Sequence, residues 1–182
     1  MFRLLRNNTY RSVMMLVISL LSVYILENYF AERNDRTDKA QMYEASRLTK
    51  YWFELVEIEK SRSGISTDKL TDIKYGGLIG AEYSEITTTL GSLDAKETVA
   101  NPDFSALIVR LLHDAGIDSN KVVGVNLSGS FPALAISVFA AVQTIKARAI
   151  VISSLGSSTF GANQPGATWI DIENWLCEKG GS

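Results

Sequence analysis

The segment KVVGVNLSGSFPALA, residues 121–135, constrains the fold of this chain more than any other. It predicts an apolar strand over residues 122–127, which runs directly into a Ser-Gly-Ser turn at residues 128–130. Pro132 then opens an apolar helix, predicted over residues 132–146. A strand that turns at once into a helix points several free backbone N–H groups at one place. The junction is therefore a candidate site for an anion or a reacting oxygen.

The elements around this junction predict an α/β domain with a parallel sheet. Apolar runs predict further strands over residues 78–83 and 149–153, and the start Asn-Pro-Asp predicts a helix over residues 102–115. Strands that alternate with helices favour a parallel sheet covered on both faces. Three strands are few for such a sheet. The domain is either minimal or incomplete at its C-terminus, and we favour the incomplete alternative.

The N-terminus predicts a single transmembrane helix. Three arginines precede residues 12–26, an uncharged and strongly apolar stretch. These fifteen residues would rise only about 22 Å as a helix, so neighbouring residues would have to extend the span. The positive flank would place the remainder of the chain outside the cytoplasm, at the cell membrane. A cleaved signal peptide and a buried helix remain as alternatives.

A second helix is predicted between the apolar stretch and the domain, within residues 31–60. Its expected face is spaced at helical intervals: Ala40, Tyr43, Arg47, Trp52, Leu55 and Ile58. One interpretation is a juxtamembrane helix that packs its aromatic and aliphatic residues on the domain. The alternative is a contact helix for a membrane partner. The predicted organisation is thus residues 1–30 as cytoplasmic tip and anchor, 31–60 as helix and 61–182 as the extracytoplasmic domain.

Composition excludes several classes of function. The 182 residues carry a net charge of −2, without the basic excess that nucleic-acid binding requires. One histidine, His113, and one cysteine, Cys177, are too few for a zinc site. We therefore predict no metal, no cofactor and no nucleic-acid partner.

The loops after the three predicted strands are rich in hydroxyls and should meet at one edge of the sheet. We predict that they hold an anionic ligand through neutral donors and one lysine. The candidate ligand-binding residues are Thr87, Thr88, Thr89, Lys96, Ser128, Gly129, Ser130, Ser154, Ser157 and Ser158.

A catalytic interpretation of the same loops would make Ser128 or Ser130 a nucleophile. The segment lacks the glycines of a nucleophile elbow, and His113 falls inside a predicted helix. Lys96 could act as a base if desolvated, and Glu82 or Glu85 as an acid or base. Serines that cap the following helix explain the pattern equally well, so we favour a cap or ligand contact over a nucleophile.

Three segments resemble the poly-gamma-glutamate system protein family of bacteria. The first segment is GLIGAEYSEITTTLGSLDAKETVANPDFSALIVRLL, which contains a triple threonine. The second is VNLSGSFPALAIS, which contains the Ser-Gly-Ser turn, and the third is AIVISSLGSSTFGANQPGATWIDIE. The resemblance covers roughly residues 77–173. It implies a membrane protein that accompanies synthesis and export of the capsule polymer poly-gamma-glutamate, alongside other membrane proteins of that system. It supplies no catalytic residues, and members of the family are longer than this chain.

Together these observations predict a membrane-anchored accessory protein that binds an anionic ligand, with the carboxylates of the polymer as the candidate. Two alternatives stay open. One is a serine-type hydrolase or transferase acting on the polymer. The other is a purely structural partner of a membrane synthase, acting through residues 31–60. Whether the chain is an enzyme is not decided by its sequence.

Overall fold

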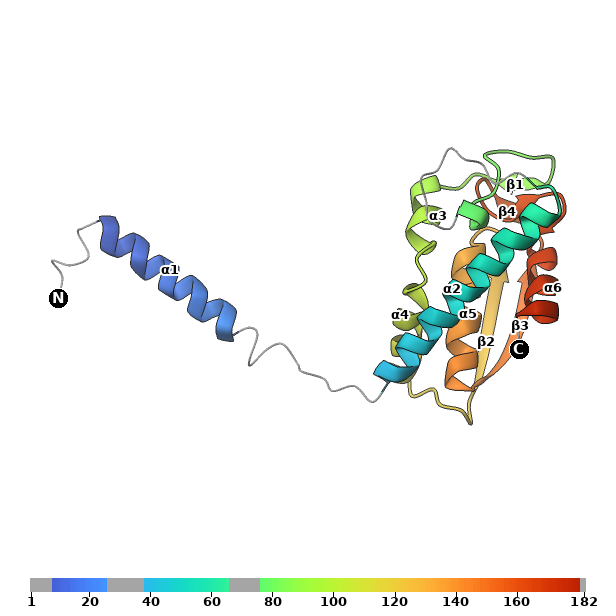
Figure 1. The fold of residues 1–182 in the computed structure, drawn as a ribbon. Coiled ribbons are helices and arrows are strands. Elements are labelled where there is room, and N and C mark those ends of the chain that lie inside the picture. Colours follow the sequence, from blue (N-terminus) through green and yellow to red (C-terminus); the bar gives the residue numbers. More distant parts are fainter. Residues whose placement is uncertain (1–7, 26–37, 66–75, 181–182) are drawn as a thin grey trace. The chain divides into compact units, whose positions relative to one another are not determined.

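The computed structural model of the protein describes residues 8–25, 38–65 and 76–180 (Figure 1). The chain divides into two compact units, Met1–Thr37 and Asp38–Ser182. The first unit contributes helix α1, Asn8–Ile25. The second is a mixed α/β unit with the elements α2 (Lys39–Arg62), a 3-10 turn η3 (Gly76–Leu78), β1 (Thr87–Thr89), α3 (Leu93–Val99), α4 (Phe104–Asp114), β2 (Val122–Ser128), α5 (Pro132–Ile145), β3 (Arg148–Ser154), β4 (Ser157–Ser158), β5 (Asn163–Gln164), β6 (Ala167–Thr168) and α6 (Trp169–Lys179).

The predicted transmembrane helix is wrong, and with it the single-pass, extracytoplasmic placement. Within the described ranges, no helix has both the length and the apolar character needed to cross a membrane. Helix α1 has 18 residues and rises about 27 Å, less than the roughly 30 Å of a hydrocarbon core. Its first turn begins with Asn8 and contains Arg11, so its apolar part is shorter still.

Helix α5 forms the centre of the second unit. It lies between a layer made by α2 and α4 and the sheet made by β2 and β3 (Figure 1). Nine of its 14 residues are buried, which suits a helix that is apolar on nearly every side. Its C-terminus is closed by Lys146 in the left-handed conformation (φ 62°), so that β3 begins only two residues later.

Strands β2 and β3 confirm the predicted parallel pair. They align over seven residues, from Val122 beside Arg148 to Ser128 beside Ser154. The third predicted strand, over residues 78–83, does not form. Leu78 and Ile79 are buried there, and Gly80 donates its N–H to the Phe160 carbonyl at 3.1 Å. The segment thus packs as a loop on a distant loop, because glycine at position 80 allows close approach of the two backbones.

Helix α2 confirms the predicted second helix but buries a different face. Trp52 and Phe53 enter the core as expected, together with Ala45 and Thr49. Tyr43, placed on the predicted face, is 69% exposed. The short side chains of Ala45 and Thr49 let α2 approach its neighbouring helices closely. Small and polar residues of this kind give no clear apolar periodicity, so the sequence did not indicate this part of the buried face.

Two short elements occupy the predicted hydroxyl-rich loop between residues 84 and 98. Strand β1 pairs in parallel with β4, nearly 70 residues later in the chain. Helix α3 follows, with Ser92 as its N-cap: the Ser92 side chain accepts a hydrogen bond from the Ala95 N–H. Both elements position the residues of the candidate site.

Candidate functional site

The three predicted loops meet at the carboxyl ends of β2 and β3. Pairing of β1 with β4 places Thr87 beside Ser157 and Thr89 beside Ser158. The turn after β2 joins them, because the Ser130 hydroxyl accepts a hydrogen bond from the Ser158 N–H at 3.1 Å. The structure therefore brings together residues from all three loops of the predicted site.

Gly129 is the point at which the loops are tied to one another. Its N–H donates to the Ser154 carbonyl at 3.2 Å, and its carbonyl accepts from the Ala162 N–H at 2.7 Å and from the Ser157 hydroxyl at 2.9 Å. A Cβ atom at this position would lie 3.2 Å from the Ser157 Cβ. Glycine thus suits the close approach of the third loop, because an added Cβ atom would make Ser157 shift by a few tenths of an ångström, and its backbone angle is not unusual.

Lys96 lies beneath the cluster and is 1% exposed. Its ammonium group donates to the Ser130 carbonyl and, at 2.7 Å, to the Ser158 hydroxyl. The Nζ atom also lies 3.7 Å from the centre of the Phe131 ring, within range of a cation–π contact. Among the described residues, Lys96 forms no ion pair with a carboxylate. Burial lowers the pKa of Lys96 from 10.5 to about 8.

Several of the predicted hydroxyls have structural partners within the loops. Thr87 Oγ1 accepts from the Ser84 N–H and from Asn163 Nδ2, both at 2.9 Å. Thr88 Oγ1 donates to the Ser157 carbonyl at 3.0 Å. Thr88, Thr89 and Ser154 are nevertheless exposed at the surface of the cluster. These three residues, with half-buried Thr87, Ser128 and Ser130, are the predicted hydroxyl residues that remain accessible.

The N-terminus of α5 opens onto the same cluster. Its N-cap is Phe131, which has no side-chain oxygen, and no side-chain cap is formed. The proposal that Ser128 or Ser130 caps this helix is therefore wrong. Instead, Ser128 Oγ accepts from the Ser130 N–H at 3.4 Å. The first turn of α5 keeps backbone N–H groups that have no acceptor within the helix, together with the positive end of its dipole.

The serine with a potential base is Ser158, and the sequence did not single it out as a nucleophile. Its hydroxyl is the one that contacts Lys96, whereas Ser130 offers Lys96 only its carbonyl. Ser158 is 3% exposed and lies under Gly91, where an added Cβ would come 2.7 Å from Ser158 Oγ. The Gly91 backbone is held in turn by two hydrogen bonds with Thr159. The pair has the composition of a serine–lysine dyad, and both of its side chains are buried.

The other predicted acid–base residues lie outside this network. His113 Nε2 contacts Gln41 Oε1 at 2.7 Å, which joins α4 to α2. Glu82 and Glu85 are exposed on the surface. None of the three contacts Ser128 or Ser130 in the described part of the chain.

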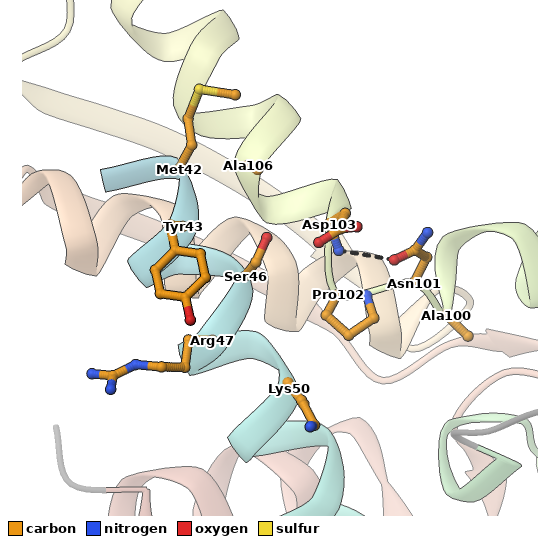
Figure 2. Close-up of a pocket in the computed structure, with 10 residues that line it drawn as sticks. All are labelled: Met42, Tyr43, Ser46, Arg47, Lys50, Ala100, Asn101, Pro102, Asp103 and Ala106. Atoms are coloured by element: carbon orange, nitrogen blue, oxygen red, sulfur yellow. Dashed lines mark hydrogen bonds between the residues drawn. The ribbon is translucent and has the colours of Figure 1, made fainter. Parts of the chain in front are cut away.

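A groove lies elsewhere, between α2 and the start of α4, with a volume of about 730 Å³ (Figure 2). Arg47 and Lys50 project from α2, and Asp103 stands on the opposite wall with its N–H bonded to Asn101 Oδ1 at 3.0 Å. Arg47 is already paired with Glu44 at 2.9 Å. The groove carries mixed charge and contains none of the predicted loop residues.

Comparison with known proteins adds no identity. No family model, no curated protein and no solved structure matches this chain. The chemistry of the loop cluster must therefore be argued from its own geometry: a buried cation without a carboxylate partner in the described residues, next to an uncapped helix N-terminus.

Proposed function

We propose that the second unit binds an anionic ligand at the loop cluster, as an accessory protein of poly-gamma-glutamate capsule synthesis or export. The observation that carries the proposal is Lys96, a buried ammonium group next to Phe131 at the start of α5. Burying a charge without a counter-ion is costly, and a bound anion offsets that cost. The polymer's carboxylates are the candidate ligand, because the sequence resembles that family.

Each part of the cluster has a separate role in this proposal. Lys96 and the α5 dipole supply a positive potential from below, without contacting the ligand. The exposed hydroxyls of Thr89 and Ser154 donate hydrogen bonds to the carboxylate oxygens from above, while Thr88 keeps its hydrogen bond to the Ser157 carbonyl. Gly129 holds the loops at the spacing that this requires. The net charge of −2 opposes a polyanion, so affinity depends on local donors and on low salt.

The loop geometry is tested by adding one methyl group to Gly129. Gly129→Ala pushes against Ser157, whereas Gly124→Ala, within the strand β2 that precedes the turn, meets nothing within 4 Å. In calorimetric titration with oligo-gamma-glutamate, we expect affinity to fall about tenfold, near 1.4 kcal/mol, in the first variant only. Equal affinities in both variants would place the site elsewhere. Equal binding of oligo-alpha-glutamate would retain an anion site and remove the polymer as its specific ligand.

The electrostatic part is tested by pH. Lys96 has a pKa of about 8, so it loses its proton as the pH rises through that value. Affinity for the anion should therefore decrease between pH 7 and pH 9, roughly in proportion to the protonated fraction. Lys96→Met should bind weakly at all pH values. A wild-type affinity that is constant over this interval would contradict a role for Lys96.

One distance favours a second candidate function, serine-type hydrolysis or transfer. The 2.7 Å contact between Lys96 and Ser158 would let the neutral amine accept the Ser158 proton. A fluorophosphonate probe that labels the wild type but not Ser158→Ala would support it. Labelling that survives Ser158→Ala would eliminate this dyad.

A further inference from the structure

Two leucines are exposed at the border of the loop cluster. Leu90 is 84% exposed, more than any other large apolar side chain in the described part of the chain, and Leu155 is 59% exposed. Each directly follows one of the hydroxyl residues that face the proposed ligand, Thr89 and Ser154. A single exposed leucine needs no explanation. Two of them beside one polar cluster give that cluster an apolar border, which marks a binding surface.

The backbone on both sides of Leu90 is fixed by hydrogen bonds. Before it, the Thr89 carbonyl accepts from the Thr159 N–H at 3.0 Å. After it, the Gly91 N–H donates to Thr159 Oγ1 at 2.7 Å, and the same hydroxyl donates to the Gly91 carbonyl at 3.0 Å. The fold thus holds an apolar side chain at the surface with an ordered backbone.

The backbone on both sides of Leu155 is held in a similar way. The Ser154 carbonyl accepts from the Gly129 N–H at 3.2 Å, and Ser154 Oγ accepts from the Gly156 N–H at 3.2 Å. A Cβ atom added at Gly156 would lie 3.5 Å from Thr88 Oγ1, so the segment that follows β3 lies against β1. Neighbouring segments of one cluster therefore carry the two leucines.

We propose that the anion bound at the cluster carries an aliphatic segment next to its carboxylate, and that Leu90 and Leu155 cover this segment. The inference rests on the anion site proposed above and adds the class of its ligand, an aliphatic carboxylate. Lys96 and the start of α5 supply the positive potential for the carboxylate. The leucines remove the adjoining methylenes from water. Salt does not screen this apolar contribution, and the net charge of −2 does not oppose it.

Simpler ligands match only one part of this surface. An inorganic anion would leave both leucines exposed to water. A neutral apolar compound would leave the buried ammonium group of Lys96 without the negative charge that stabilises it. A carboxylate joined to an aliphatic chain matches both parts.

A series of straight-chain carboxylates from butanoate to octanoate tests the ligand class on the full chain. The readout is the NMR chemical shift of the Gly129 and Ser130 amides, so that binding at other surfaces is not counted. Full burial of a methylene raises affinity about fourfold. Because the leucines cover only part of the chain, we expect about twofold for each methylene, or about sixteenfold over the series. Hexanol, which lacks the charge, should bind at least about tenfold more weakly than hexanoate.

Serine variants test the two leucines. Leu90→Ser and Leu155→Ser should each lower the affinity for octanoate about threefold or more, and the affinity for butanoate by less than about twofold. Leu111→Ser is the matched control, because Leu111 is 56% exposed on α4, outside the loops. The same chain-length dependence in the wild type and in both loop variants would overturn the role of the leucines.

Failure of this inference and failure of the anion site give different results. If all carboxylates of the series bind at the cluster with equal affinity, the aliphatic class is wrong and the anion site stands. If none of them shifts the Gly129 and Ser130 amides, the anion site itself is wrong, and the inference fails with it.

Discussion

At the scale of single residues, the second unit buries two lysines. Lys96 lies under the loop cluster, and Lys60 donates to the Gly77 carbonyl at 2.8 Å while only 3% exposed. Burial lowers the pKa of each from 10.5 to about 8. Both side chains join segments distant in sequence. At each position the cost of burying the ammonium charge is offset in part by a tertiary hydrogen bond.

Stability should consequently rise with pH in an alkaline interval. Because the folded-state pKa of Lys60 is lower than the unfolded one, the unfolded chain binds more protons between about pH 8 and pH 10.5. The free energy of unfolding should increase there by up to about 3 kcal/mol for Lys60. Denaturant titrations at several pH values measure this slope. Lys60→Met should reduce it, whereas Lys50→Met, at a half-exposed position, should not; an unchanged slope in Lys60→Met would contradict the argument.

Lys96 also shows what sequence can reveal about a single residue. The sequence offered Lys96 as a base only on the condition that it was desolvated, and the structure buries it. The serine that Lys96 contacts was not predicted. The sequence drew attention to Ser128 and Ser130, whereas the hydroxyl that Lys96 contacts belongs to Ser158. The pairing arises from β1–β4 register, a contact across about 70 residues that no local pattern encodes.

At the scale of elements, α6 depends on the box at its start. Thr168 accepts from the Asp171 N–H, and Asp171 accepts from the Thr168 N–H at 2.8 Å. The helix carries buried Trp169, Ile172 and Leu176 into the core. Fraying at its first turn would therefore loosen the core as well as the helix.

Thr168→Ala should lower the free energy of unfolding by about 1 kcal/mol, because an N-terminal hydrogen bond is lost. Thr98→Ala is the matched control, since its exposed hydroxyl bonds only to the Asp94 carbonyl within α3. That control should change stability by less than about 0.5 kcal/mol. Urea unfolding followed by tryptophan fluorescence measures both. Similar losses in the two variants would mean that the box contributes nothing specific.

Elements defined by local signals were predictable, and elements defined by distant contacts were not. Strands β2 and β3 and helices α4 and α5 lie within two residues of their predicted bounds, because apolar runs, the Asn-Pro-Asp start and Pro132 mark them. Helix α3 and β1 were missed inside a hydroxyl-rich segment. The apolar run at residues 78–83 predicted a strand, but its backbone packs on residues 160–163 instead.

At the scale of the whole second unit, the rule for parallel strands predicted correctly that the three loops would meet. The loops met because the carboxyl ends of β2 and β3 share one edge. The sequence could not show that many of the hydroxyls in these loops form hydrogen bonds within the cluster, as Thr88 does with the Ser157 carbonyl. A cluster whose polar groups are hydrogen-bonded to one another is rigid before a ligand binds, and this favours binding without rearrangement.

The position of α5 between a helical layer and a sheet has a consequence for how the unit opens. Ile136, Ala140 and Ala141 are fully buried, so water reaches their amides only when α2 or the sheet detaches. Hydrogen exchange in these amides should be the slowest in the unit and should report its global unfolding, while the amide of exposed Asp94, in the first turn of α3, exchanges sooner. Exchange in α5 as rapid as in α3 would disprove this. The unit would then denature in stages, instead of as the single cooperative body that a shared central helix imposes.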